Sequence, residues 1–477
     1  MSVLDDFFQV RRRGSTIGRE VIGGLTTFMA MSYILFVQPA VLERAGMDRG
    51  GVFMATCIAS GAACVLMGLL ANYPIALAPG MGENFFFVFT LCAGGPAAAA
   101  ASGAFHLTWP EALALTAAVG VVFLLLSTVG VRSMLLNAIP DTLKSGIAAG
   151  IGLFIALIGF EWGNLIQHDP VTCVKLAGIQ GNYVAGLTLL GLGITLSLMA
   201  FHVRGAILIG ILATTVATGA VGWIWGFQTL ELTAVVGAPE GLGQTAGAFW
   251  AGFATLGEKL LGPHTLEVIG FGFILLFMDL FDTVGTLVGV ASRADLMTDG
   301  RLPRAERALA ADAAGTVFGG CLGTSTVTSF IESVTGVSAG ARTGLAAVVA
   351  GLCMLAALFF QPLVHVIGGG VNVGTAAAPV VRYPMIAPAL IAVGAMMMRA
   401  MRELDWDDVT EALPGFLAMV SIPFTFSIAT GIAIGFVSYA FGKLATGRPR
   451  ACPIIVYVFA VLFVVQYVLG ACTNVIR

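Results

Sequence analysis

The chain has 477 residues, of which 58% are hydrophobic and only 10% are charged. Because soluble domains carry about 25% charged residues, this composition excludes a water-soluble globular protein and favours one that folds in lipid. The net charge of −3 at pH 7 excludes a basic field for binding nucleic acid.

Apolar segments recur along the whole chain, each near the length of about 20 residues that crosses a bilayer as a helix. In chain order they are 21–42, 51–71, 76–92, 112–130, 143–161, 182–200, 204–225, 265–290, 305–321, 326–341, 344–364, 384–401, 411–444 and 453–470. Seven segments lie on either side of a polar, glycine-rich stretch at 226–263. Since seven is odd, the second set begins on the opposite face of the membrane. We therefore expect an all-α polytopic membrane protein with two inverted repeats, 1–225 and 264–477, joined by an extracellular or periplasmic loop.

The segment 411–444 admits two interpretations. It is too long for one straight span and contains Pro423. Basic residues at its end, Lys443 and Arg448 among them, favour a hairpin that returns to the cytoplasm. The even total of segments instead favours one broken span, so both alternatives stay open.

Positively charged residues in short loops indicate the cytoplasmic side of a membrane protein. Here they precede the first segment and lie in every second loop after it. They are Arg11, Arg12, Arg13, Arg19, Arg132, Lys144, Arg204, Arg293, Arg301, Arg304 and Arg307. All fall on one side if the N-terminus is cytoplasmic, so we predict a multi-pass protein of the cell inner membrane with that orientation.

Four carboxylates within the predicted spans are candidates for the site, because charge there is costly and usually functional. They are Glu83, Asp279, Asp282 and Glu332, and no Lys or Arg lies deep in a span to pair with them. Burial without a partner disfavours the charged form of a carboxylate, so such a group can load and release a proton. Asp279 and Asp282 share a helix face, so one can hold a proton while the other accepts hydrogen bonds from a substrate. The alternative is that one of the pair only caps a helix break or accepts a hydrogen bond from a neighbouring hydroxyl.

Two of the predicted spans are interrupted just before these carboxylates. Pro79, Gly80 and Gly82 precede Glu83 and Asn84 in the third segment, and the polar stretch 323–326 precedes Glu332 in the tenth. Irregular backbone at membrane depth is tolerated where it lines a cavity or is buried in protein. Each break would place the N-terminus of a half-helix near the middle of the bilayer, although kinks that serve helix packing alone are the alternative.

The residue types at these breaks suit a flat heterocycle. Carboxylates accept hydrogen bonds and the Asn84 amide both donates and accepts them, while Phe85 offers an apolar ring face. A nucleobase fits these groups better than an anion, because no fixed cation lies in these segments, although the Phe run could equally face lipid. The five histidines lie in or near loops, the eight cysteines form no CxxC pair, and no GxxxxGK[ST] motif is present. The sequence therefore predicts neither an enzyme, nor a metal site, nor an ATP-driven pump.

Several stretches carry a resemblance to a known family. They are GGLTTFMAMSYILFVQPAVL from Gly23, ANYPIALAPGMGENFFF from Ala71, GIGLFIALIG from Gly150, LFDTVGTLVGVA from Leu280 and GTSTVTSFIESVTGVSAGARTGL from Gly323. Over almost its whole length the chain resembles the nucleobase–cation symporters of the nucleobase/ascorbate transporter superfamily, in particular the azaguanine-permease-like branch of purine permeases. The resemblance implies a core domain from segments 1–4 and 8–11 and a gate domain from segments 5–7 and 12–14. It also implies that segments 3 and 10 are each a short strand plus a half-helix.

By motif position, the resemblance implies roles for individual residues. Gly82, Asn84, Asp279 and Glu332 look like purine-binding residues, and Asp282 looks like the proton-linked one. Glu83 departs from the family pattern, in which this position is commonly apolar or small. It would therefore add an acceptor to the site, shift the proton site, or point away from it.

The expected activity is proton-coupled uptake of adenine, hypoxanthine or guanine by elevator-like alternating access. The alternatives are a xanthine or uracil permease and an anion transporter of the same fold. The expected partners are the purine and membrane lipid, with a homodimer through the gate domain suggested by analogy. No cofactor is expected besides the proton as coupling ion, for which sodium is the alternative.

Overall fold

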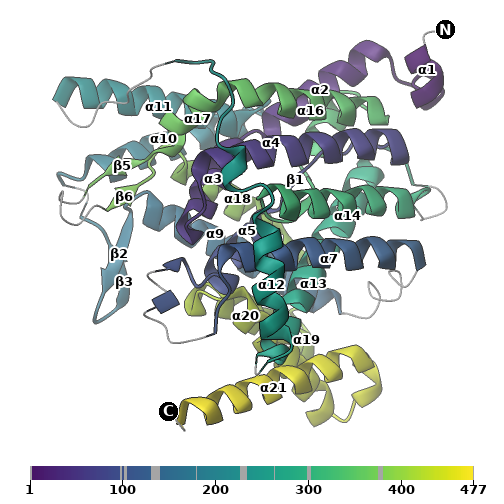
Figure 1. Ribbon diagram of the computed structural model, residues 1–477, viewed down its shortest axis with the longest axis vertical. Coiled ribbons are helices and arrows are strands. Elements are labelled where there is room, and N and C mark those ends of the chain that lie inside the picture. The colour runs from purple at the N-terminus through teal and green to yellow at the C-terminus, as the bar shows by residue number, and fades with distance from the viewer. Residues whose placement is uncertain are drawn as a thin grey trace.

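The computed structural model describes residues 3–96, 99–100, 105–129, 140–178, 180–225, 234–262, 264–297, 302–373 and 380–475. Arg132, Arg301 and parts of the predicted connecting loop lie outside these residues. Within them the fold is almost entirely helical, and nine helices are long and apolar enough to cross a membrane. Figure 1 shows α2, α4, α7 and α14 running across the same view. The prediction of an all-α polytopic protein is confirmed.

The first half of the chain contains a short N-terminal helix followed by longer ones. Its helices are α1 (Val3–Phe8), α2 (Ile17–Met31), α3 (Ile34–Leu42), α4 (Arg49–Leu66), α5 (Met81–Phe85), α7 (Trp109–Val129), α9 (Asp141–Trp162), α10 (Tyr183–Ala200) and α11 (Ala206–Trp225). Two π-helical turns, Met67–Ala71 and Phe86–Leu91, extend α4 and α5.

The second half begins with a helix in the connecting loop. Its helices are α12 (Ala248–Leu260), α13 (Thr265–Arg293), α14 (Ala305–Leu322), α15 (Ser333–Ser338), α16 (Gly344–Ala357), α17 (Gln361–Gly368), α18 (Ala387–Met397), α19 (Val409–Thr425), α20 (Ile428–Ala445) and α21 (Ile454–Val475). Lys259 on α12 forms an ion pair with Glu111 on α7 at 2.7 Å, which ties the connecting loop to the first half.

The six described strands form three antiparallel pairs. The pairs are β1 (Leu77–Pro79) with β4 (Val327–Ser329), β2 (Ile166–Asp169) with β3 (Cys173–Leu176), and β5 (Val371–Asn372) with β6 (Val381–Arg382). Two of these pairs are local hairpins. The pair β1–β4 instead joins one strand from each half of the chain, with Ala78 opposite Thr328.

The β1–β4 pair forms because neither segment can continue as a helix. Pro79 lacks the N–H that a helix interior needs, and Gly323 ends α14 with a φ of +103°, a left-handed conformation that glycine adopts at no steric cost. α5 begins two residues after β1, and α15 begins four residues after β4. The expected strand-plus-half-helix geometry is present in both the third and the tenth segments.

The structure resolves the segment 411–444 as a hairpin. Gly431 lies against Ile422 and Gly435 lies against Ala418, so α19 and α20 run antiparallel. Their far ends are joined by an ion pair of 2.6 Å between Lys443 and Glu411. The broken-span alternative is therefore wrong, because this single predicted segment contains the two helices α19 and α20.

Following the predicted division, we call α9–α11 and α18–α21 the gate domain and α2–α7 and α13–α17 the core domain. In the core domain α16 packs on α2 and α4, and α14 packs on α7. In the gate domain α9 packs on α18 and α19, with Gly152 and Gly394 in close contact where α9 crosses α18. The crossing of β1 and β4 lies within the core domain, and α5 there faces α9 of the gate domain.

Candidate functional site

The predicted site residues come from elements that meet around the β1–β4 pair. α5 carries Glu83 and Asn84, α13 carries Asp279 and Asp282, and Glu332 stands at the N-cap position of α15. α13 contacts β4, α5 and α15. The fold therefore brings together side chains from the two halves that are separated by about two hundred positions in the chain.

Asp279 is fully buried and held by a hydroxyl from the neighbouring helix. The Thr316 hydroxyl on α14 donates to Asp279 Oδ2 at 3.1 Å, and it also lies 3.2 Å from the carbonyl oxygen of Val327 on β4. Thr316 thus links α13 to the strand pair. This arrangement fixes the position of the Asp279 carboxylate relative to the half-helices.

Asp312 on α14 is a fifth carboxylate at the site, which our reading of the sequence missed. It is fully buried and accepts hydrogen bonds from the hydroxyls of Thr283 on α13, at 2.7 Å, and Ser329 on β4, at 3.0 Å. The signal that identified the other four also applies to Asp312, because it is an acidic residue within the predicted span 305–321. Asp312 belongs with the residues that hold α13, α14 and β4 in register.

Asp282 differs from Asp279 although only one helical turn separates them. Its carboxylate accepts a hydrogen bond of 3.2 Å from the Thr328 hydroxyl on β4, yet the residue is exposed whereas Asp279 is fully buried. A space large enough for water therefore reaches Asp282. The two carboxylates are suited to different tasks.

Glu332 and Tyr33 connect the second half-helix to the first segment. The Tyr33 hydroxyl donates to Glu332 Oε1 at 2.9 Å, and Glu332 is partly exposed. Tyr33 itself is buried at the junction of α2 and α3. The carboxylate is thus oriented by one donor and still accessible to a ligand.

The first half-helix presents a buried amide and a buried carboxylate. The Ser325 hydroxyl donates to Asn84 Oδ1, and the Asn84 amide nitrogen has the Met81 sulfur at 4.0 Å as a weak acceptor. Glu83 is 2% exposed, and in the described part of the chain its Oε2 atom has no hydrogen-bond partner. That oxygen lies directly over Gly80, where any side chain would displace it.

Gly82 and Phe85 lie against α9 of the gate domain. A Cβ atom on Gly82 would lie 3.2 Å from Ile151 on α9. The fully buried Phe85 ring stacks on Phe89 and meets Phe154 of α9 edge-on, both at 5.9 Å between ring centroids. A stacking role for Phe85 stays a prediction.

The donors to these carboxylates are hydroxyl groups. Thr316, Thr328 and Tyr33 serve Asp279, Asp282 and Glu332 respectively. Across the described ranges no three His, Cys, Asp or Glu side chains are arranged to hold a metal ion. The chemistry that such a site offers is hydrogen-bond acceptance and the exchange of protons.

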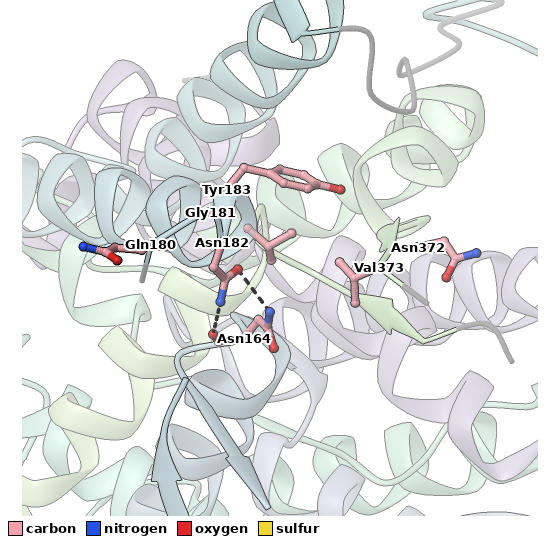
Figure 2. Close-up of a pocket in the computed structure, with 8 residues that line it drawn as sticks. Asn164, Gln180, Gly181, Asn182, Tyr183, Asn372 and Val373 are labelled. Carbon is pink, nitrogen blue, oxygen red and sulfur yellow. Dashed lines mark hydrogen bonds between the residues drawn. The ribbon is translucent and has the colours of Figure 1, made fainter. Parts of the chain in front are cut away.

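A separate cavity lies at one end of the gate domain. Its volume is about 380 Å³, and its lining includes Asn164, Asn182 and Asn372 (Figure 2). The Asn164 amide donates to Asn182 Oδ1 at 3.1 Å, and Asn182 Nδ2 donates to the Asn164 carbonyl at 3.2 Å. Asn182 also caps α10. These amides therefore serve the local fold, and the cavity contains none of the predicted site residues.

The fold is similar to that of a solved structure. It resembles the transmembrane domain of the cyanobacterial bicarbonate transporter BicA with a TM-score of 0.57 and 14% sequence identity, over 88% of this chain and 97% of that one. At this identity the likeness concerns the fold alone. It confirms the predicted architecture.

The sequence identifies the family. The profile of the Permease family, Xan_ur_permease, matches residues 18–434. The chain is 40% identical to the guanine/hypoxanthine permease PbuG of Bacillus subtilis over 471 residues, which is 97% of this chain and 99% of that protein. It is 36% identical to the adenine permease AdeP of Escherichia coli over 467 residues, 98% and 96% of the two chains. The chain belongs to this permease family, as the resemblance implied, and it is a multi-pass membrane transporter, not an enzyme.

Proposed function

We propose that this permease takes up a purine base, namely adenine, hypoxanthine or guanine, together with a proton. The observation that carries the proposal is the meeting of α5 and α15 around carboxylates whose donors are hydroxyls. The names of the relatives PbuG and AdeP, which specify guanine, hypoxanthine and adenine, support the choice of a purine.

Three polar side chains are proposed to bind the base. Glu332 is accessible and offers an acceptor to a ring N–H, and Asp279 offers a second acceptor from α13. Asn84 offers an N–H donor whose present partner is a sulfur at 4.0 Å. A site built to complement the hydrogen-bonding groups of its substrate rejects analogues that lack them, because its own polar groups would then be buried without partners.

The coupling proton is proposed to bind Asp282. This carboxylate combines an exposed position on α13, inside the predicted span, with a hydrogen bond to Thr328 on β4. A proton neutralises its charge, which lowers the cost of moving the core domain through an apolar environment. Sodium as the coupling ion is the alternative that the experiment below separates.

One face of α13 supports alternating access. Phe271, Met278, Asp282, Gly285 and Ser292 recur at helical spacing and share this face. The first two are buried, whereas the last three are exposed. This face of α13 is thus buried up to the site and exposed from Asp282 to its C-terminal end at Arg293. The basic residues in the loops predict that this end is cytoplasmic. We propose that this conformation is inward-facing and that an elevator-like movement of the core domain exposes the site to the other side.

The location and the assembly of the permease are part of the proposal. The pattern of basic loops supports the cell inner membrane with a cytoplasmic N-terminus, and analogy with the family supports a homodimer through the gate domain. Crosslinking across the gate domain in native membranes tests the second point, and a monomer would contradict it.

The test is an uptake assay in cells that lack their own base permeases. Radiolabelled adenine, hypoxanthine, guanine, xanthine and uracil are supplied separately, with and without a protonophore and with sodium replaced by choline. Purine uptake that the protonophore abolishes and choline leaves intact supports the proposal. Loss of uptake in choline identifies sodium coupling. Transport of only xanthine or uracil would show that the proposed substrate is wrong. If no base is taken up, the proposal fails and the anion-transporter alternative is favoured.

A further inference from the structure

Helix α9 of the gate domain lies against the half-helix that carries Glu83 and Asn84. A Cβ atom built on Gly82 would lie 3.2 Å from Ile151 Cγ2 and 3.4 Å from Ile151 Cδ1, and equally 3.4 Å from Met278 Cε on α13. The absence of a side chain at Gly82 is what lets Ile151 reach the backbone of α5. Ile151 therefore approaches the site from the gate-domain side.

Phe154 extends the same surface by one helical turn. It is three residues after Ile151, and residues at this spacing are neighbours on a helix. Its fully buried ring meets Phe85 edge-on at 5.9 Å and Phe89 edge-on at 5.7 Å. Phe426, at the turn between α19 and α20, packs behind it at 5.6 Å. The ring is thus held between the half-helix and the gate-domain hairpin.

Glycines that flank Ile151 on α9 hold this surface in place against the gate domain. A Cβ atom on Gly150 would lie 2.9 Å from the Met419 carbonyl oxygen on α19, and one on Gly152 would lie 2.8 Å from the Gly394 carbonyl oxygen on α18. α9 therefore rests backbone to backbone on two gate-domain helices. Ile151 and Phe154 thus form an anchored apolar surface against the half-helix that carries Glu83 and Asn84.

We propose that Ile151 and Phe154 form the gate-domain wall of the site and set the size of base that the permease accepts. The inference rests on the proposed function and adds specificity-determining residues that bind no polar atom of the substrate. An apolar wall distinguishes ligands that differ by one methyl or methylene group by roughly 10- to 200-fold. Base selection is thus divided: core-domain polar groups recognise the hydrogen-bonding edge, and α9 limits what projects from the ring.

The first test is a double-mutant cycle between the two domains. Gly82→Ala places a methyl group against Ile151, so we expect purine uptake to fall at least about 10-fold, as misfitting methyl groups do in apolar sites. Ile151→Ala should restore a large part of the uptake when combined with Gly82→Ala. Additive effects of the two substitutions would overturn the proposal, because independent sites add and contacting ones do not.

The second test measures substrate range. Ile151→Ala and the milder Ile151→Val should raise the uptake of N6-methyladenine or N2-methylguanine relative to the unmethylated base, by about 10-fold for the Ala variant. Ile158→Ala is the matched control, because Ile158 is equally buried on α9 two turns further along and should not change the ratio. The amount of each variant in the membrane is measured by a fluorescent fusion.

Different results would contradict the proposed function and the proposed role of Ile151 and Phe154. If the unmodified permease carries no purine, the proposed function is wrong. If it carries purines but the ratio of methylated to parent base stays unchanged in both Ile151 variants, or changes equally in Ile158→Ala, the wall is not where selection occurs.

Discussion

The two half-helices have the same backbone plan but different surroundings. α5 follows β1 and α15 follows β4, and the two strands pair with each other. Glu83 on the first is 2% exposed, and the half-helix that carries it contacts α9 of the gate domain, whereas Glu332 on the second is partly exposed and held by Tyr33. An inverted repeat thus reproduces the geometry of a site while its chemistry is set by what each copy faces. We infer that the α15 side exchanges ligand with solvent and that the α5 side is the closed wall.

The largest effect is expected at the carboxylates of these half-helices. Glu332→Ala should abolish uptake, at least about 100-fold, because a hydrogen bond to a charged group contributes up to about 3 kcal/mol. Glu332→Gln should retain part of it. Glu83→Gln should reduce uptake less than Glu332→Gln, measured as initial rates of the best purine at equal amounts in the membrane. The reverse order would contradict the division between an open and a closed side.

The next effect concerns coupling. The Asp282→Asn variant should no longer accumulate purine against a concentration gradient, because an amide cannot bind and release the coupling proton. It should still exchange labelled for unlabelled base across the membrane. Counterflow assays measure the exchange. If Asp282→Asn still concentrates the base, Asp282 is not the coupling residue.

A smaller effect is expected at the residue that orients Glu332. Tyr33→Phe removes one hydroxyl donor, and a hydrogen bond contributes about 1 kcal/mol net, which corresponds to about fivefold in KM with little change in the maximal rate. The Tyr457 hydroxyl lies far along the chain near Pro449, so Tyr457→Phe is the matched control. An unchanged KM in Tyr33→Phe would show that Glu332 needs no orientation from α3.

The smallest effect concerns pH dependence outside the site. Hydrogen bonding with Lys175 and with the Thr172 and Val171 backbone lowers the pKa of the partly buried Asp169 to about 2. A lowered pKa means that the ionised, stabilising form persists at any pH above the ordinary value near 4 and is lost only as the pH falls toward 2. Asp169→Asn should therefore leave the pH profile of uptake between pH 5 and pH 8 unchanged. A shifted profile would mean that the β2–β3 hairpin takes part in the pH response.

Much of the fold could be read from the sequence because membranes impose strong rules. Buried charge, proline and glycine at mid-span predicted the half-helices around Glu83 and Glu332, and the family resemblance added the short strands, which the pairing of β1 with β4 confirms. Asp312 was not predicted, although it too is an acidic residue within a predicted span. The hairpin at 411–444 was left open because hydropathy cannot distinguish two short helices from one long broken span.

Other features could not be predicted from local patterns. The approach of Ile151 to Gly82 depends on how α9 packs across the two domains, and both residues look like ordinary helix interior in the sequence. The difference between Asp279 and Asp282 likewise depends on how α14 and β4 pack against α13. Contacts between distant segments decide both, so periodicity alone carries no signal for them.

The central claim, purine transport driven by a proton gradient, is tested most directly with the purified protein in liposomes. An inward proton gradient is imposed in sodium-free buffer with the membrane voltage clamped, and the accumulation of labelled adenine, hypoxanthine and guanine is followed. The account predicts that at least one purine rises above its external concentration inside the liposomes and that a protonophore collapses the excess. Uptake that stops at equal concentrations on both sides, with the gradient still in place, would contradict it.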